Sequence, residues 1–87
     1  TVMAPGDAWD LRQMVRWSLK HDGPTSIRYP KATADEITAA ELGGEREPLE
    51  LGRAEVLNWA EDGMLIACGS LLSEARKAAQ TLRDEGY

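Results

Sequence analysis

The chain has 87 residues and a formal net charge of −5 at pH 7. This length allows one small domain with a modest core, and the acidic balance argues against nucleic acid and anionic membranes as partners, because both need a basic field. The single cysteine, Cys68, excludes an intrachain disulfide and favours a reducing compartment, the cytoplasm. The longest apolar run, Met64 to Cys68, is too short to span a bilayer.

The first thirty residues predict a strand, a helix and a second strand. The apolar run from Val2 to Ala4 indicates the end of a buried strand. Asp7 fits the N-cap of an amphipathic helix that stops before Gly23, and Thr25 to Tyr29 fits a strand. Short connections between these elements make a βαβ unit, which favours a parallel sheet.

The next segment loses this pattern. Residues 32–50 are rich in Ala, Glu, Thr and Gly, which predicts a linker across a surface with one helical turn between Ala34 and Leu42. The run Glu45 to Glu47, which contains Arg46, is interpreted as part of this solvated linker.

The last part predicts a hairpin followed by a helix. Apolar residues alternate from Leu49 to Trp59, a turn signal follows, and Met64 to Cys68 forms a second apolar run. Cys68 lies inside that run and is expected to be a buried, inert thiol. A helix then follows Gly69 and ends at Gly86. Because a lone βαβ unit cannot bury both faces of its strands, and because both chain ends fall beside apparent elements, we expect the chain to be a piece of a larger α/β enzyme.

Candidate chemistry gathers at the end of the second predicted strand. Ligands of open α/β sheets bind at the carboxyl ends of strands, and Arg28 and Lys31 flank Tyr29-Pro30 there. An arginine fork and a lysine point charge suit a phosphate. Composition alone favours the plainer interpretation, in which Arg28 forms an ordinary ion pair and Lys31 is a solvated loop residue. His21 is interpreted as a cap of the helix C-terminus.

The chain lacks the motifs of a self-contained active site. It has neither a glycine-rich phosphate loop nor an HExxH zinc motif. One histidine and one cysteine, far apart in sequence, make no convincing catalytic pair. We therefore expect no catalytic residue in this chain.

The sequence nevertheless resembles a known family. The segment from Val2 to Asp7, the segment from His21 to Lys31 (HDGPTSIRYPK) and the segment from Met64 to Leu71 are similar to those of the 1-deoxy-D-xylulose-5-phosphate synthases. These are thiamine-diphosphate-dependent, transketolase-like enzymes. The resemblance covers nearly the whole chain, and GPTSIRYPK is its most specific part.

The resemblance implies a multidomain transketolase-like fold. Residues 1–31 would end the pyrimidine-binding domain, residues 32–50 would form the interdomain linker, and residues 51–87 would begin the C-terminal domain. The family decarboxylates pyruvate on thiamine diphosphate with Mg²⁺ and adds the two-carbon unit to glyceraldehyde 3-phosphate, as a homodimer, in isoprenoid and thiamine synthesis.

The resemblance also implies roles for single residues. Lys31 matches a basic residue, more often arginine, that binds the phosphate of glyceraldehyde 3-phosphate, and Arg28 matches the preceding arginine of the strand. Ala32 and Thr33 stand where the family usually has a glycine. The catalytic residues and the ligands of diphosphate and Mg²⁺ lie upstream in the family, so this piece is expected to bind no cofactor and to be inactive alone.

Two other interpretations stay open at this point. The chain could come from another transketolase-like enzyme, such as a transketolase or the β subunit of a 2-oxo acid dehydrogenase. It could also be a small non-catalytic interaction module that keeps the ancestral sequence. The reading frame upstream of Thr1 separates the module from an enzyme fragment.

Overall fold

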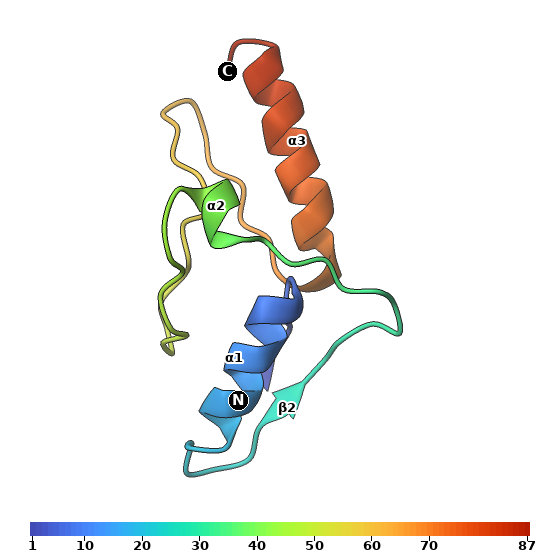
Figure 1. Cartoon of the computed structure of the whole chain (residues 1–87), viewed down its shortest axis with the longest axis vertical. Coiled ribbons are helices and arrows are strands. Elements are labelled where there is room, and N and C mark those ends of the chain that lie inside the picture. The colour runs from blue at the N-terminus through green and yellow to red at the C-terminus, as the bar shows by residue number, and fades with distance from the viewer.

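A computed structural model describes all residues from 1 to 87. It is elongated, with extents of 45 × 25 × 23 Å. In chain order its elements are strand β1 (Val2–Met3), helix α1 (Ala8–Ser18), strand β2 (Ser26–Ile27), helix α2 (Ala39–Leu42), the short 3-10 helix η1 (Gly69–Leu71) and helix α3 (Leu72–Asp84). Figure 1 shows β1, α1 and β2 grouped at one end of the molecule and α3 at the other.

The predicted βαβ unit is present. β1 and β2 pair in parallel, with Val2 opposite Ser26 and Met3 opposite Ile27. The Asp7 side chain caps α1 by accepting a hydrogen bond of 2.8 Å from the backbone N–H of Asp10. The helix ends at Ser18, earlier than the glycine signal suggested, since Gly23 lies in the loop beyond it. The mixed helix and parallel-strand content is compatible with an α/β fold.

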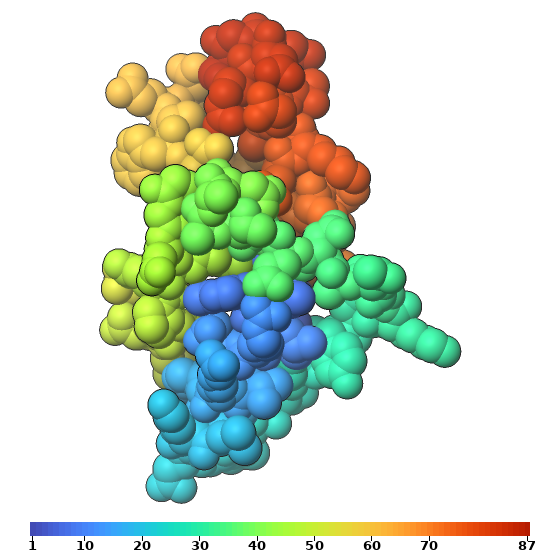
Figure 2. Space-filling model, in the orientation of Figure 1, coloured from blue at the N-terminus to red at the C-terminus, as the bar shows by residue number.

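The predicted helical turn in the linker is confirmed as α2. Thr38 and Glu41 form a reciprocal capping box at its start, and Gly43 ends it in the left-handed conformation with φ of 72°. Beyond α2 the chain runs as an extended connector along one side of the molecule, where Figures 1 and 2 show it in green to yellow beside the blue α1.

The predicted hairpin between Leu49 and Cys68 is wrong, because this segment forms no strand. Most of its large apolar side chains are exposed, with Trp59 82% and Ile66 89% accessible. A two-stranded hairpin is marginal in water unless a third strand or a helix covers its apolar face, and the side chains of Trp59, Met64 and Ile66 have no such cover in this chain. Cys68 is also exposed, not buried as expected.

The predicted final helix is confirmed. α3 ends in a Schellman motif, in which the Tyr87 N–H donates to the Leu82 carbonyl and the Gly86 N–H to the Arg83 carbonyl, at 3.0 Å each. Its other end meets the end of β1: the Gly69 N–H donates to the Ala4 carbonyl at 3.1 Å. None of the helices is both long and apolar enough to cross a membrane.

The buried core is very small. Met3, Pro5, Asp7 and Ile37 are the buried residues, and they gather where the end of β1 meets the start of α1. One of them is a charged residue, so polar contacts have a large share in holding this junction. The predicted division at residues 31 and 50 stays a prediction.

Candidate functional site

The carboxyl ends of both strands lie at one edge of the small sheet, because the strands are parallel. The segment after β1 leads to Asp7, and the segment after β2 leads through Arg28 to Lys31. The backbone N–H of Arg28 donates to the Met3 carbonyl at 2.8 Å, which continues the ladder to this edge. The fold therefore places the two predicted phosphate-binding cations where α/β sheets bind ligands.

Arg28 and Lys31 are both exposed. Neither side chain forms a hydrogen bond or an ion pair with another residue of this chain. The structure therefore offers two open cations beside a strand end and no carboxylate that occupies them. Their binding of a phosphate stays a prediction.

The loop that carries Lys31 is held at its far end on the start of α1. The Ala8 N–H donates to the Asp35 carbonyl at 2.9 Å, and the Ile37 N–H donates to Asp7 Oδ2 at 2.9 Å. The exposed side chains of Arg12 and Glu36 add a bidentate ion pair. The loop is thus tied to the βαβ unit on both sides of Lys31.

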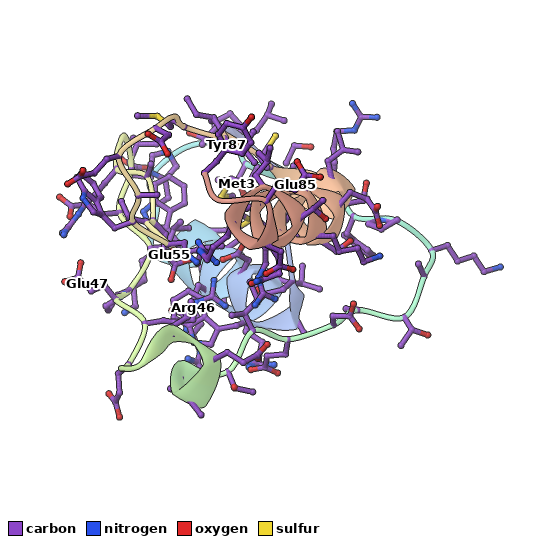
Figure 3. The ribbon with its side chains drawn as sticks, turned by 90° about the horizontal axis from the view of Figure 1, so that it is seen from above. Met3, Arg46, Glu47, Glu55, Glu85 and Tyr87 are labelled. Carbon is purple, nitrogen blue, oxygen red and sulfur yellow. The ribbon has the colours of Figure 1, made fainter.

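Arg46 is the largest departure from the sequence interpretation, which placed it in a solvated linker. Its side chain is 2% exposed and reaches three carboxylates. Nη1 donates to Asp7 at 2.6 Å, and Nη2 to Asp10 at 3.1 Å. Nε and Nη2 bind the two oxygens of Glu55 at 2.8 and 2.6 Å, a fork geometry that only arginine offers. In Figure 3 Glu55 lies beside Arg46, while Glu47 points away.

Stacking completes the surroundings of Arg46. Its guanidinium carbon lies 4.1 Å from the ring centroid of Trp9, a cation–π contact with the first turn of α1. We call Arg46, its three carboxylates and Trp9 the Arg46 cluster. A sequence signal for it existed: Arg46 is the one cation between Lys31 and Arg53, in a segment rich in glutamate.

The electrostatics of the cluster follow from burial. Burial raises the pKa of Asp10, and the nearby Asp7 and Glu55 carboxylates raise it further, although the Gly6 N–H and Arg46 act against this shift. Hydrogen bonds to Glu55 and Asp7 raise the pKa of Arg46 despite its burial. Arg46 therefore stays charged at every accessible pH, and its charge is balanced by the carboxylates of the cluster.

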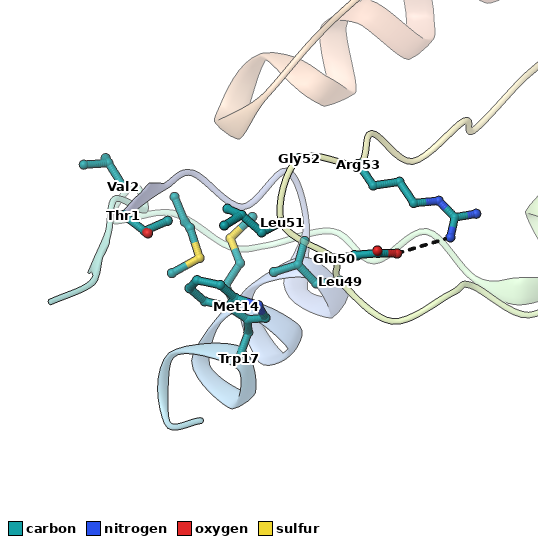
Figure 4. A pocket seen from close by; sticks show the side chains of 10 residues that line it. Thr1, Val2, Met14, Trp17, Leu49, Glu50, Leu51, Gly52 and Arg53 are labelled. Atoms are coloured by element: carbon teal, nitrogen blue, oxygen red, sulfur yellow. Dashed lines mark hydrogen bonds and ion pairs between the residues drawn. The ribbon is translucent and has the colours of Figure 1, made fainter. Parts of the chain in front are cut away.

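A shallow apolar pocket of about 200 Å³ lies on another part of the βαβ unit. Figure 4 shows Trp17 and Met14 of α1 on one side, with Leu49 and Leu51 of the connector opposite. The charged groups at its rim, Glu50 and Arg53, pair with each other at 3.4 Å. At this pocket the connector packs against α1, and the residues that line it include no set of groups suited to catalysis.

Two other residues singled out by sequence take simple structural roles. The imidazole of His21 stacks on Trp17, with ring centroids 4.3 Å apart, and its backbone N–H donates to the Trp17 carbonyl at 3.0 Å, so His21 caps a helix carbonyl through its backbone and not through its side chain. The thiol of Cys68 is free and exposed. No group of three or more His, Cys, Asp or Glu side chains is arranged to hold a metal ion.

Comparison with known proteins gives a consistent match along almost the whole chain. It is 41% identical over 86 residues to the 1-deoxy-D-xylulose-5-phosphate synthase of Prochlorococcus marinus, 36% identical to that of Desulfotalea psychrophila and 38% identical to that of Desulforudis audaxviator. These alignments cover 98–99% of this chain. The chain matches one segment of the 1-deoxy-D-xylulose-5-phosphate synthases. The resemblance seen in the sequence is thereby confirmed.

The match covers only a small part of each of these relatives. The chain spans 13% of the length of these 1-deoxy-D-xylulose-5-phosphate synthases. No protein-family model matches the chain. No solved structure matches it either.

Proposed function

We propose that this chain is part of a thiamine-diphosphate-dependent synthase that condenses pyruvate with glyceraldehyde 3-phosphate to 1-deoxy-D-xylulose 5-phosphate and CO₂. Within that enzyme, Lys31 and Arg28 bind the phosphate of glyceraldehyde 3-phosphate. The observation that carries the proposal is the match along 99% of the chain to proteins that share one name. The complete enzyme is proposed to be a cytoplasmic homodimer.

The site chemistry supports the role of the two cations. A phosphate dianion needs cationic donors, and the chain as a whole is acidic, so attraction has to be local. Arg28 and Lys31 are exposed and free of ion pairs, unlike Arg46, whose side chain is 2% exposed and paired with carboxylates. Lys31 acts as a point charge, which holds a phosphate without the two-point geometry of arginine.

Binding at this site contributes to the reaction indirectly. The phosphate does not react, so contacts to it supply binding energy that fixes the position of the aldehyde elsewhere in the same substrate. Lys31 is thus expected to select a phosphorylated acceptor and orient it, without taking part in bond making.

The residues of this chain do not fit thiamine diphosphate or Mg²⁺. The buried carboxylates Asp7 and Asp10 are bound to Arg46, and no group of acidic side chains is arranged around a metal position. The proposal therefore assigns no cofactor ligand to this chain and derives no step through the cofactor.

Substitution of Lys31 tests the proposal in the full-length enzyme. Lys31→Ala is expected to raise the KM for glyceraldehyde 3-phosphate about tenfold, the effect of one lost charged contact, while the KM for pyruvate is unchanged. Lys31→Arg should restore the KM. Lys20→Ala, at an exposed lysine beyond α1, is the matched control. An unchanged KM in Lys31→Ala would remove Lys31 from the phosphate site.

A further inference from the structure

Asp7 joins three parts of the chain through one buried carboxylate. Its Oδ1 accepts from the Asp10 N–H at the start of α1, and its Oδ2 accepts from the Ile37 N–H at the end of the Lys31 loop. The same Oδ2 binds Arg46 Nη1 of the connector at 2.6 Å. Only 2% of the Asp7 side chain is exposed, so these three partners take the place of water around its carboxylate.

Such a carboxylate depends on a nearby cation. A buried ionised group is tolerated only when it is paired and hydrogen-bonded, and removal of the partner leaves an uncompensated charge. Arg46 is the cation that reaches Asp7. Without it, the buried carboxylate of Asp7 lacks its cation and has to turn toward water, which weakens its bond to the Ile37 N–H.

The bond to Ile37 matters because of where it lies. Residues 29–34, which include Lys31, form no hydrogen bond with the rest of the chain. The path of this loop is set by hydrogen bonds at its two ends. At one end the Arg28 N–H bonds to Met3, and at the other the segment from Asp35 to Ile37 bonds to the start of α1. A loop tied at both ends explores fewer positions than one tied at a single end.

Arg46 itself is unable to bind the substrate phosphate. Its side chain is 2% exposed, and its donors are engaged by Asp7, Asp10 and Glu55. Any effect of Arg46 on phosphate binding therefore passes through the loop.

We propose that Arg46 is a positioning residue for the substrate-phosphate site: by pairing with Asp7 it fixes the far anchor of the loop that carries Lys31. This inference rests on the proposed function, which supplies the phosphate ligand. The loop then presents Lys31 at the carboxyl edge of the sheet at low entropic cost, and the connector that contains Arg46 becomes part of the substrate site without touching substrate.

The test compares acceptors with and without a phosphate in the full-length enzyme. The readout is the ratio of kcat/KM for glyceraldehyde 3-phosphate to kcat/KM for glyceraldehyde, because a general loss of structure lowers both values alike. Arg46→Met is expected to lower this ratio about fivefold, less than Lys31→Ala, since the cation remains but is poorly placed. Arg53→Met, at an exposed arginine of the same connector, is the control and should leave the ratio unchanged.

A double substitution shows whether both residues act on one contact. If Arg46 acts through Lys31, Arg46→Met should lower the ratio no further in a Lys31→Ala background. Equal loss for both acceptors, or the full additional loss in the double variant, overturns the positioning role. An unchanged ratio in Lys31→Ala alone overturns the proposed phosphate site instead, so the two failures are distinguishable.

A second variant and a direct measurement guard against misfolding. Arg46→Lys keeps the charge but lacks the fork that spans Asp7 and Glu55, and it should lower the ratio by an intermediate factor of about two. Amide hydrogen exchange in Arg46→Met should become faster at Ile37 and Ala8, while the Arg28 amide, which donates to the Met3 carbonyl, keeps its protection. Unchanged exchange at Ile37 contradicts the inference.

Discussion

The more apolar of two regions of this chain is the less ordered one. In residues 1–46 a βαβ unit and the loop after it close on a small buried junction, and Ile37 is 4% exposed there. In residues 47–68 the chain has a larger share of apolar residues and forms no regular element, and Ile66 is 89% exposed.

The difference shows that an apolar pattern needs a partner surface before it becomes structure. The first region has one, because β2 returns to pair with β1 and the Asp7 carboxylate draws in the Ile37 segment. The second region is held to the first by the ion pair between Arg46 and Glu55 and by the apolar side chains that meet at the pocket beside Trp17. Its apolar residues are those expected to meet further strands in a longer protein.

Truncating one isoleucine side chain in each region gives the strongest test of this comparison. Ile37→Ala removes a buried side chain and is expected to destabilise the junction by about 2 kcal/mol. Ile66→Ala removes a side chain that is already in water and should change stability by less than about 0.5 kcal/mol. The free energy of opening, measured by amide hydrogen exchange at Ala8, checks both values. Equal losses in the two variants would contradict the contrast between the regions.

The local sequence rules predicted the elements that carry their own signals. Asp7 and the glycine at position 86 each mark a helix end through contacts a few residues apart, and both are confirmed. The predicted helical turn between Ala34 and Leu42 is also confirmed, and the structure adds a capping box of Thr38 and Glu41 at its start. The predicted hairpin was wrong for the opposite reason. Strand formation at Leu51 or Ile66 depends on neighbours distant in sequence, which a periodic pattern does not report.

Helix α3, which follows the second region, docks on the βαβ unit, and this contact has an intermediate expected effect. A Cβ at Gly6 would overlap the Leu72 side chain and lie 3.0 Å from its Cβ. Gly6→Ala is therefore expected to weaken this contact by about 1 kcal/mol. Exchange of the Gly69 amide, which donates to the Ala4 carbonyl, should become faster.

Gly44→Ala is the control for this substitution, because a Cβ at Gly44 meets nothing within 4 Å. It should leave exchange at Gly69 unchanged. If Gly6→Ala also leaves that amide protected, Leu72 has moved aside at little cost and α3 is not tightly held by this contact.

The candidate site was predictable only in part. The cations at the end of β2 follow from strand order and from the family resemblance. The Arg46 cluster does not, because its members lie up to 48 positions apart between Asp7 and Glu55 and no local motif links them. A single arginine in a glutamate-rich segment was the available hint, and its usual meaning is a solvated charge.

The titration of Asp10 gives the smallest expected effect and tests whether the Arg46 cluster is a buried environment. Burial raises the pKa of Asp10 above its ordinary value. A carboxyl group whose pKa is raised by folding stabilises the folded state fully below its unfolded pKa of about 4, and this contribution is lost as the pH rises through the higher folded value.

An NMR titration of the Asp10 side-chain carboxyl should therefore show a midpoint above the ordinary value for aspartate. Because the charge of Arg46 opposes the shift, Arg46→Met should move the midpoint higher still. A midpoint at the ordinary value would mean that water reaches the cluster freely, and one below it would mean that Arg46 and the Gly6 N–H outweigh burial. Either result would contradict a buried environment that is dominated by desolvation.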